Sequence, residues 1–310
     1  MDDANAAAAG KQMLSDVDLP PLFHAADSSS LEAQRYFLRA TKIRLWGLIL
    51  AALFGLFEWK FFGPPVDFAG VFAAVAFCFV LAAEAYLLQA KPERTWYEGR
   101  AAAESVKTLS WRYAVGGAPF NIAVETESAV KNLYLERLRS LFDVVKDLDL
   151  VAPTSSQEQL TEPMRKARSL SLDERKKIYE IDRVQNQQDW YQSKARIHKQ
   201  SANLWTMALI GFEFVGVIFG ILKAIGVCEM DILTFSGVLV GAVATWLQAK
   251  QFRTLATAYT VTALELASIR SKIKDQLDEA SWATFVDNAE EAFSREHTLW
   301  KASHVDRPVQ

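Results

Sequence analysis

The stretch LQAKPERT at residues 88–95 returns as LQAKQFRT at residues 247–254, with six of eight positions identical, and each copy follows a long apolar run. At the same spacing of 159 residues, Leu45-Trp46 falls on Leu204-Trp205, so the starts of these apolar regions also match. Apolar composition does not supply the shared Gln, Lys and Arg. The pattern therefore indicates an internal duplication, in which each unit carries two apolar segments followed by LQAK-x-x-R-T.

Four blocks are dense in apolar residues, although 23% of the chain is charged and its net charge is -3. A helix that crosses a hydrocarbon core of roughly 30 Å needs about 20 predominantly apolar residues. The second and third blocks meet this length, and the first and fourth meet it with flanking residues at the interfaces. We therefore expect an all-α membrane protein with two duplicated two-span hairpins, four transmembrane helices in all, rather than a soluble bundle. The blocks are residues 43–57 with a tail to 63, 66–88, 204–227 and 232–247.

Basic residues gather next to the outer ends of these hairpins, before the first and third spans and after the second and fourth. Examples are Arg39, Lys42, Lys199 and Lys250, whereas the connecting turns hold only Lys60 and Lys223. Because positive charge favours the cytoplasmic side, both termini and the long middle section are predicted to be cytoplasmic. This predicts a multi-pass membrane protein whose first span serves as the targeting signal, since no signal peptide precedes it.

Turn and capping patterns divide the chain into modules. We expect a disordered leader at residues 1–18, a first module at 19–149, a linker at 150–170, a second module at 171–303 and a tail at 304–310. Ser29-x-x-Glu32 and Ser171-x-x-Glu174 each resemble a capping box that opens a helix. The long cytoplasmic segments carry apolar stripes at helical spacing, which favours their packing into a bundle over use as a docking surface for another protein. The stripes include Val130, Tyr134 and Leu138; Leu255, Tyr259, Leu266, Ile273 and Leu277; and Trp282, Val286, Phe293 and Trp300.

Enzyme, cofactor and metal motifs are not found in the sequence. It has no glycine-rich phosphate loop and no H-E-x-x-H, and its two cysteines and four scattered histidines suggest no ligand cluster. The neighbouring carboxylates Glu290 and Glu291 are expected on a solvated face. We predict no enzyme activity, no cofactor and no nucleic-acid binding, because membrane orientation already explains the basic residues, which can contact anionic lipid headgroups.

Two acids inside the spans are the candidate pore-lining or intramembrane polar residues. Glu213 lies nine residues beyond Leu204, roughly 14 Å into the hydrocarbon, and Glu84 lies four residues before Leu88, roughly 6 Å from the inner surface. An ionised group at the midplane is costly unless it faces water or a partner. Glu213 either lines a hydrated path or joins helices as a neutral, hydrogen-bonded acid. Glu84 has the further alternatives of reaching the interface or pairing with a nearby base.

Small residues on the spans are predicted to let helices approach closely in lipid. Two short hairpins enclose no aqueous path by themselves, so any pore requires several copies around an axis, and we expect a homo-oligomer. The predicted helix-packing residues are Gly47, Ala51 and Gly55 on the first span and Gly216 and Gly220 on the third.

The arrangement resembles the SLATT family, the SMODS and SLOG associating two-transmembrane effectors, in a tandem form with two modules. The resemblance rests on soft helix patterns over about residues 19–300. These patterns are LPPL at 19–22 and AESVKTLSWRY at 103–113 in the first module, and Tyr179, Arg183, Gln187, Trp190-Tyr191 and Lys194-Ala195 in the second.

The resemblance implies an effector of a nucleotide-triggered, anti-phage conflict system that forms a pore or perturbs the inner membrane, and it carries no catalytic residues. No nucleotide-sensing domain is recognisable in the chain, so a nucleotide second messenger would bind the cytoplasmic helices directly, or a cytoplasmic sensor protein would act on them. A nonconducting membrane scaffold for a cytoplasmic partner is the main alternative. A small transporter is less favoured, because the two units share one orientation and lack broken helices.

Overall fold

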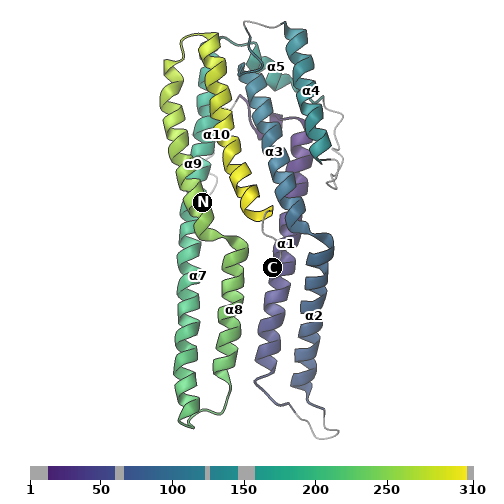
Figure 1. Ribbon diagram of the computed structural model, residues 1–310, viewed down its shortest axis with the longest axis vertical. Helices are drawn as coiled ribbons and strands as arrows, with labels where there is room; N and C mark the ends of the chain where they lie inside the picture. The colour runs from purple at the N-terminus through teal and green to yellow at the C-terminus, as the bar shows by residue number, and fades with distance from the viewer. Residues whose placement is uncertain (1–12, 60–65, 123–125, 146–157, 306–310) are drawn as a thin grey trace. The chain divides into compact units, whose positions relative to one another are not determined.

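The computed structural model describes residues 13–59, 66–122, 126–145 and 158–305, and the regular structure in these ranges is helical (Figure 1). The chain divides into two compact units, each built from segments far apart in the sequence. We call residues 34–93 and 194–257 the hairpin unit, and the remainder the bundle unit. The described residues contain no strand. The expected all-α architecture is therefore confirmed.

The first hairpin of the hairpin unit pairs the end of α1 (Pro21–Phe54) with α2 (Phe68–Ala90) (Figure 1). Asp67 caps α2, because its carboxylate accepts hydrogen bonds from the backbone N–H groups of Ala69 at 3.1 Å and Gly70 at 3.3 Å. Small residues recur every seventh position along α2 and are buried, namely Ala69, Ala76 and Ala83. Because of this spacing, the three alanines lie on one narrow face of α2, and this face is buried inside the unit. The connecting turn of this hairpin, which holds Lys60, lies partly outside the described residues, at positions 60–65.

The second hairpin pairs the long helix α7 (Asn186–Ala224) with α8 (Ile232–Lys250). Its turn is held by Asp231, which forms an ion pair with Lys223 at 2.7 Å and accepts a hydrogen bond from Thr234 Oγ1 at 2.7 Å. Gly226 adopts φ +74°, a left-handed conformation that glycine reaches without steric cost. The turn is therefore held by side-chain contacts between Asp231 and polar residues at the adjoining ends of the two apolar blocks.

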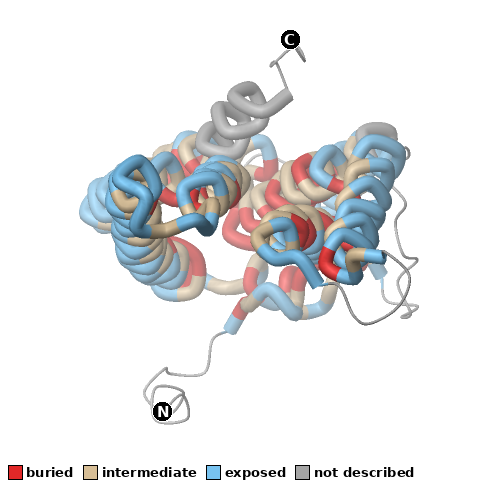
Figure 2. The backbone as a smooth tube through the Cα atoms, turned by 90° about the horizontal axis from the view of Figure 1, so that it is seen from below, coloured by how far each residue is buried: buried red, intermediate tan, exposed pale blue. Residues whose placement is uncertain are grey.

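Large apolar side chains cover the outside of the hairpin unit. Leu81 is 71% exposed and Phe214 is 65% exposed, and exposed positions recur between buried ones along the helices (Figure 2). Among the described residues, three helical stretches are long and apolar enough to cross a membrane, at Phe68–Ala90, Leu172–Ala224 and Ile232–Asp275. The expected first span is not among these stretches: α1 has 34 residues, but Arg39, Lys42 and Arg44 lie close to its end at Phe54, so its uninterrupted apolar segment is short. Such an apolar surface requires lipid or protein around it.

The bundle unit contains the start of α1, α3 (Pro92–Val115), α4 (Glu127–Val145), α5 (Glu162–Arg168), α6 (Leu172–Ile178), η2 (Tyr179–Gln185), most of α9 (Phe252–Lys272), η3 (Ile273–Asp275) and α10 (Glu279–Val305). One hydrophobic core joins these elements. The predicted stripes supply much of it, since Val130, Tyr134, Leu266, Trp282 and Val286 are buried. The prediction that the stripes pack on one another is therefore confirmed.

Several local predictions were wrong or need different boundaries. Ser29-x-x-Glu32 lies inside α1, which already begins at Pro21, because proline suits the first turn of a helix. Ser171-x-x-Glu174 does form a capping box and opens α6. Leu277, predicted on a stripe, is 84% exposed, and the stripe of Val130, Tyr134 and Leu138 lies on α4, from Glu127 to Val145. The side chain of Trp300 lies outside the described residues.

The end of the predicted leader is ordered. The backbone N–H groups of Met13 and Leu14 donate to Asp182 Oδ2 at 2.9 and 3.1 Å, and Lys107 pairs with Asp16 at 2.6 Å. Residues 1–12 lie outside the described residues. The second half of the predicted linker forms α5, whose Met164 and Ala167 are buried. These short segments become ordered because the bundle supplies partners that their own composition does not reveal.

Candidate functional site

The repeated LQAK stretches mark a backbone break where each hairpin ends. Lys91 and Gln251 adopt left-handed conformations, with φ of 43° and 47°, and end α2 and α8. Their backbone N–H groups donate to the carbonyls of Leu87 at 3.2 Å and Leu247 at 2.9 Å. Residues other than glycine rarely adopt this backbone conformation. The break falls one residue later in the second copy, because Pro92 opens α3 whereas its counterpart Gln251 can itself form the cap.

Glu84, the predicted acid of the second span, pairs with a base across the first hairpin. Its Oε2 lies 2.8 Å from Arg44 Nη1, and its side chain is 43% exposed. The pair joins α1 to α2 and gives each charge a partner in a region of low polarity. Of the roles considered for Glu84, the structure shows the pairing with a nearby base.

Glu213, the predicted midplane acid of the third span, is exposed on α7. It has no hydrogen-bond or ion-pair partner among the residues that the structure describes. Phe214 and Ile210 beside it are also exposed, at 65% and 51%. The structure therefore does not bring Glu213 and Glu84 together in one site within the chain.

The predicted packing residues differ in their surroundings. A Cβ added at Gly47 would lie 2.6 Å from Val80 Cγ2, so α1 and α2 approach closely there, and Ala51 is buried. Cβ atoms at Gly216 and Gly220 would lie 3.3 Å from Ser236 Cβ and 3.5 Å from Leu233 Cδ2, both on α8. A Cβ at Gly55 would approach only its own helix. These packing contacts lie within each hairpin.

A charged network lies fully inside the bundle unit, where the sequence indicated none. Glu290 is 0% exposed and accepts hydrogen bonds from Arg183 Nε at 3.0 Å, Arg183 Nη2 at 2.7 Å and Tyr179 Oη at 2.9 Å. The ring of Phe293 lies 4.2 Å from the Arg183 guanidinium carbon. The prediction of a solvated face was wrong for Glu290, although Glu291 is exposed. Burial is tolerated here because the carboxylate and guanidinium form a bidentate pair.

The network begins on an unusual helical turn. Tyr179 and Arg183 lie on η2, a π-helical segment between α6 and α7. A π-turn rotates the following side chains relative to an α-helix and often occurs at functional sites. A prediction based on the 3.6-residue period of an α-helix cannot detect such a π-helical segment. The sequence offered no signal that these two side chains would meet Glu290.

Two further arginines hold the end of α3 in the same core. Arg175 is 1% exposed; its Nη1 donates to the Val115 carbonyl at 2.8 Å, and it also pairs with Glu279. Arg168 donates to the carbonyls of Tyr113 at 3.0 Å and Phe120 at 2.8 Å. Tyr113 and Val115 lie in the last turn of α3, where carbonyl groups lack α-helical donors, and the arginine side chains donate to them. The same core joins segments of both predicted modules.

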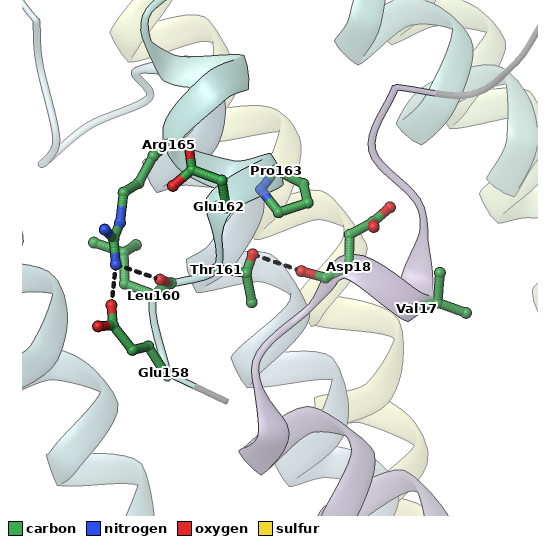
Figure 3. A pocket seen from close by; sticks show the side chains of 8 residues that line it. All are labelled: Val17, Asp18, Glu158, Leu160, Thr161, Glu162, Pro163 and Arg165. Carbon is green, nitrogen blue, oxygen red and sulfur yellow. Dashed lines mark hydrogen bonds and ion pairs between the residues drawn. The ribbon is translucent and has the colours of Figure 1, made fainter. Parts of the chain in front are cut away.

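A cleft of about 430 Å³ opens in the bundle unit beside α5 (Figure 3). The Thr161 hydroxyl donates to the Asp18 carbonyl at 2.7 Å, and Arg165 pairs with Glu158 and donates to the Leu160 carbonyl at 2.9 Å (Figure 3). The remaining lining comes from Val17, Glu162 and Pro163. Three carboxylates against one arginine make the lining net negative. The cleft is therefore a poor site for a phosphate-bearing ligand.

The described residues contain no group of three or more His, Cys, Asp or Glu side chains placed to hold a metal ion. Cys78 and Cys228 are free thiols. The buried charged groups of the described residues form ion pairs and hydrogen bonds to backbone carbonyls.

Comparison with known families matches the two halves of the chain separately. The model of the SMODS and SLOG-associating 2TM effector domain 3 matches residues 20–176, just over half of the chain, and that of the SMODS and SLOG-associating 2TM effector domain 1 matches residues 179–300. No curated protein and no solved structure matches the chain. The two matches follow the duplication and the helical hairpins described above. The chain belongs to the SMODS and SLOG-associating two-transmembrane effector family, SLATT, and carries two of its domains in tandem.

Proposed function

We propose that this protein is an oligomeric effector of the bacterial inner membrane that permeabilises the membrane when an anti-phage conflict system is activated. Several copies surround an axis, and each contributes four spans. These are the three long apolar helical stretches and, in addition, the apolar end of α1. Both termini and the bundle unit lie in the cytoplasm. The association of the family with conflict effectors and the apolar hairpin unit support this function.

The exposed, unpartnered acid at Glu213 carries the proposal. A carboxyl group roughly 14 Å into the hydrocarbon costs several kcal/mol unless it meets water or another protein group. Glu84 has met this requirement inside the chain through Arg44, whereas Glu213 has no partner among the described residues. A second copy or a hydrated path between copies supplies the partner that the described residues of one copy do not.

The bundle unit is the proposed control element. Its core ties segments of both SLATT domains together, since Trp282 Nε1 donates to the Val115 carbonyl at 2.7 Å and the Ala118 N–H donates to the Ala283 carbonyl at 2.9 Å. A signal that repacks this core reaches both hairpins at once. A nucleotide second messenger or a cytoplasmic sensor protein provides that signal, and the net negative lining of the cleft beside α5 disfavours the nucleotide there.

The test measures membrane potential in bacteria that express the protein together with the products of its neighbouring genes. Wild type is expected to depolarise the cells, as reported by a voltage-sensitive dye. Glu213→Leu should reduce the rate of depolarisation about tenfold or more at equal expression, because a carboxylate in a narrow path concentrates cations by at least that factor. Glu229→Leu removes the same charge from an exposed turn and serves as the matched control.

Two outcomes would contradict the proposal. If wild type never changes the membrane potential, the nonconducting scaffold replaces the pore. If Glu213→Leu depolarises cells as fast as wild type and Glu229→Leu, the acid does not line the path.

A further inference from the structure

Two lysine ammonium groups share one indole ring at the end of the second hairpin. Lys42 Nζ lies 5.6 Å from the centre of the Trp246 ring, and Lys250 Nζ lies 5.8 Å from it. Lys250 Nζ also lies 5.9 Å from the ring centre of Phe252. Lys42 comes from α1 and the other residues from α8 and α9, so the cluster joins the two hairpins within one unit.

The described part of the chain provides no counter-charge for the two lysines of this cluster. Neither Lys42 nor Lys250 forms an ion pair with any residue in the described ranges. Lys42 and Lys194 both repel the Lys250 ammonium electrostatically. The neighbouring base Arg44 differs, because it pairs with Glu84. The aromatic faces attract each ammonium but carry no net charge, so the repulsion between the lysines persists.

A hydrogen-bond donor in the same cluster also lacks an acceptor. The indole Nε1 of Trp246 is buried and has no partner among the described residues. A buried N–H that finds no acceptor costs free energy. One anion with several acceptor oxygens would meet both needs, since it would accept from the indole and neutralise the ammonium groups. A phosphate group has this charge and these oxygens.

The cluster lies where the apolar segments end. Lys42 directly precedes the first apolar block, which starts at residue 43, and Lys250 follows the fourth block, which ends at residue 247. Apolar surface for acyl chains adjoins it, because Ile43 is 50% exposed. In the predicted topology this is the depth of the cytoplasmic lipid headgroups, where Trp is enriched and basic pockets between spans bind phosphate.

We propose that Lys42, Lys250 and Trp246 form a binding site for a phosphate-bearing anion, and that an anionic phospholipid headgroup supplies it. The lysines provide charge from both hairpins, and the indole N–H provides a directed donor. The bound lipid would bridge the two SLATT domains at the membrane surface. A freely dissolved phosphate offers the same chemistry but cannot use the adjoining apolar surface.

Native mass spectrometry of the full-length protein in detergent tests the site. We expect saturable binding of phosphatidylglycerol at concentrations where phosphatidylcholine, which has no net charge, does not bind. Lys42→Gln/Lys250→Gln should weaken this binding about 30-fold, the loss expected for two lysine contacts to an anionic headgroup. The Lys42→Arg/Lys250→Arg variant should keep most of the wild-type binding, and Trp246→Phe should weaken the binding of phosphatidylglycerol a few-fold.

The matched control is Arg196→Gln/Lys199→Gln, which removes the same charge from two exposed residues of α7 outside the cluster. Its phosphatidylglycerol binding should stay within about threefold of wild type, because distant exposed charges are screened. Equal weakening in both double variants would overturn the site in favour of diffuse attraction. If inorganic pyrophosphate displaces no lipid, the result supports a phosphate supplied by the lipid. If wild type binds phosphatidylglycerol and phosphatidylcholine alike, the result overturns the proposal.

Discussion

The two units treat charge in opposite ways. The bundle unit buries Arg183 and Glu290 completely and pairs them, whereas the hairpin unit leaves Glu213 exposed among apolar side chains, with no partner among the described residues. In water, a buried charge must find its partner within the fold. In lipid, an exposed charge must find its partner outside the chain. The bundle unit thus completes its own interior, whereas the hairpin unit presents an acid and apolar side chains that the described residues do not cover.

The largest expected effect breaks the pairing in the bundle unit. Glu290→Ala leaves the Arg183 guanidinium buried without its counter-charge, and we expect a loss of about 3–5 kcal/mol of unfolding free energy. Glu291→Ala, at an exposed neighbouring position, should change it by about 0.5 kcal/mol or less. Unfolding of the full chain in detergent, followed by tryptophan fluorescence, measures both. Equal stability of the two variants would mean that Arg183 finds another partner.

An intermediate effect is expected where the hairpin helices touch. Gly47→Ala forces a Cβ to 2.6 Å from Val80 Cγ2, and overpacking of this kind costs about 1–3 kcal/mol. Gly237→Ala on α8 meets nothing within 4 Å and should be neutral or stabilising by up to about 1 kcal/mol, since alanine favours helix. The same detergent unfolding assay compares them. A large cost for Gly237→Ala would show that another chain covers that face of α8.

The smallest effect is expected at Asp27, an acid that is only half-buried, in contrast to the fully buried Glu290. Burial raises the pKa of Asp27, although Arg100, whose Nη1 lies 3.4 Å away, opposes this. A raised pKa contributes stability that is present below the ordinary aspartate pKa of about 3.9 and is lost as pH rises through the raised value. Asp27→Asn should therefore gain stability relative to wild type between about pH 4 and 7, by about 1 kcal/mol or less.

Asp173→Asn, whose parent side chain is 93% exposed, is the control for this pH series. Thermal unfolding across the pH range measures both variants against wild type. A relative loss of stability for Asp27→Asn as pH rises would show that the ion pair with Arg100 outweighs the cost of burial.

Local patterns predicted much of the fold and little of its polar interior. The apolar blocks predicted the hairpins, and Ser171-x-x-Glu174 predicted the start of α6. Glu84 was recognised as an intramembrane acid, but its pairing with Arg44 was only one of several alternatives. The partner of Glu290 could not be found from the sequence, because Arg183 is 107 residues away and reaches it from a π-turn.

The sequence by itself determined the duplication, the helical architecture, the apolar segments and the presence of acids within them. These features depend on composition and on periodicity along a single helix, which are local properties. Only the tertiary structure decided which charges are paired, which glycines lie against a neighbour and which lysines gather at Trp246. Such contacts join residues far apart in the chain, so they depend on how helices pack and not on the order of residues within any one of them.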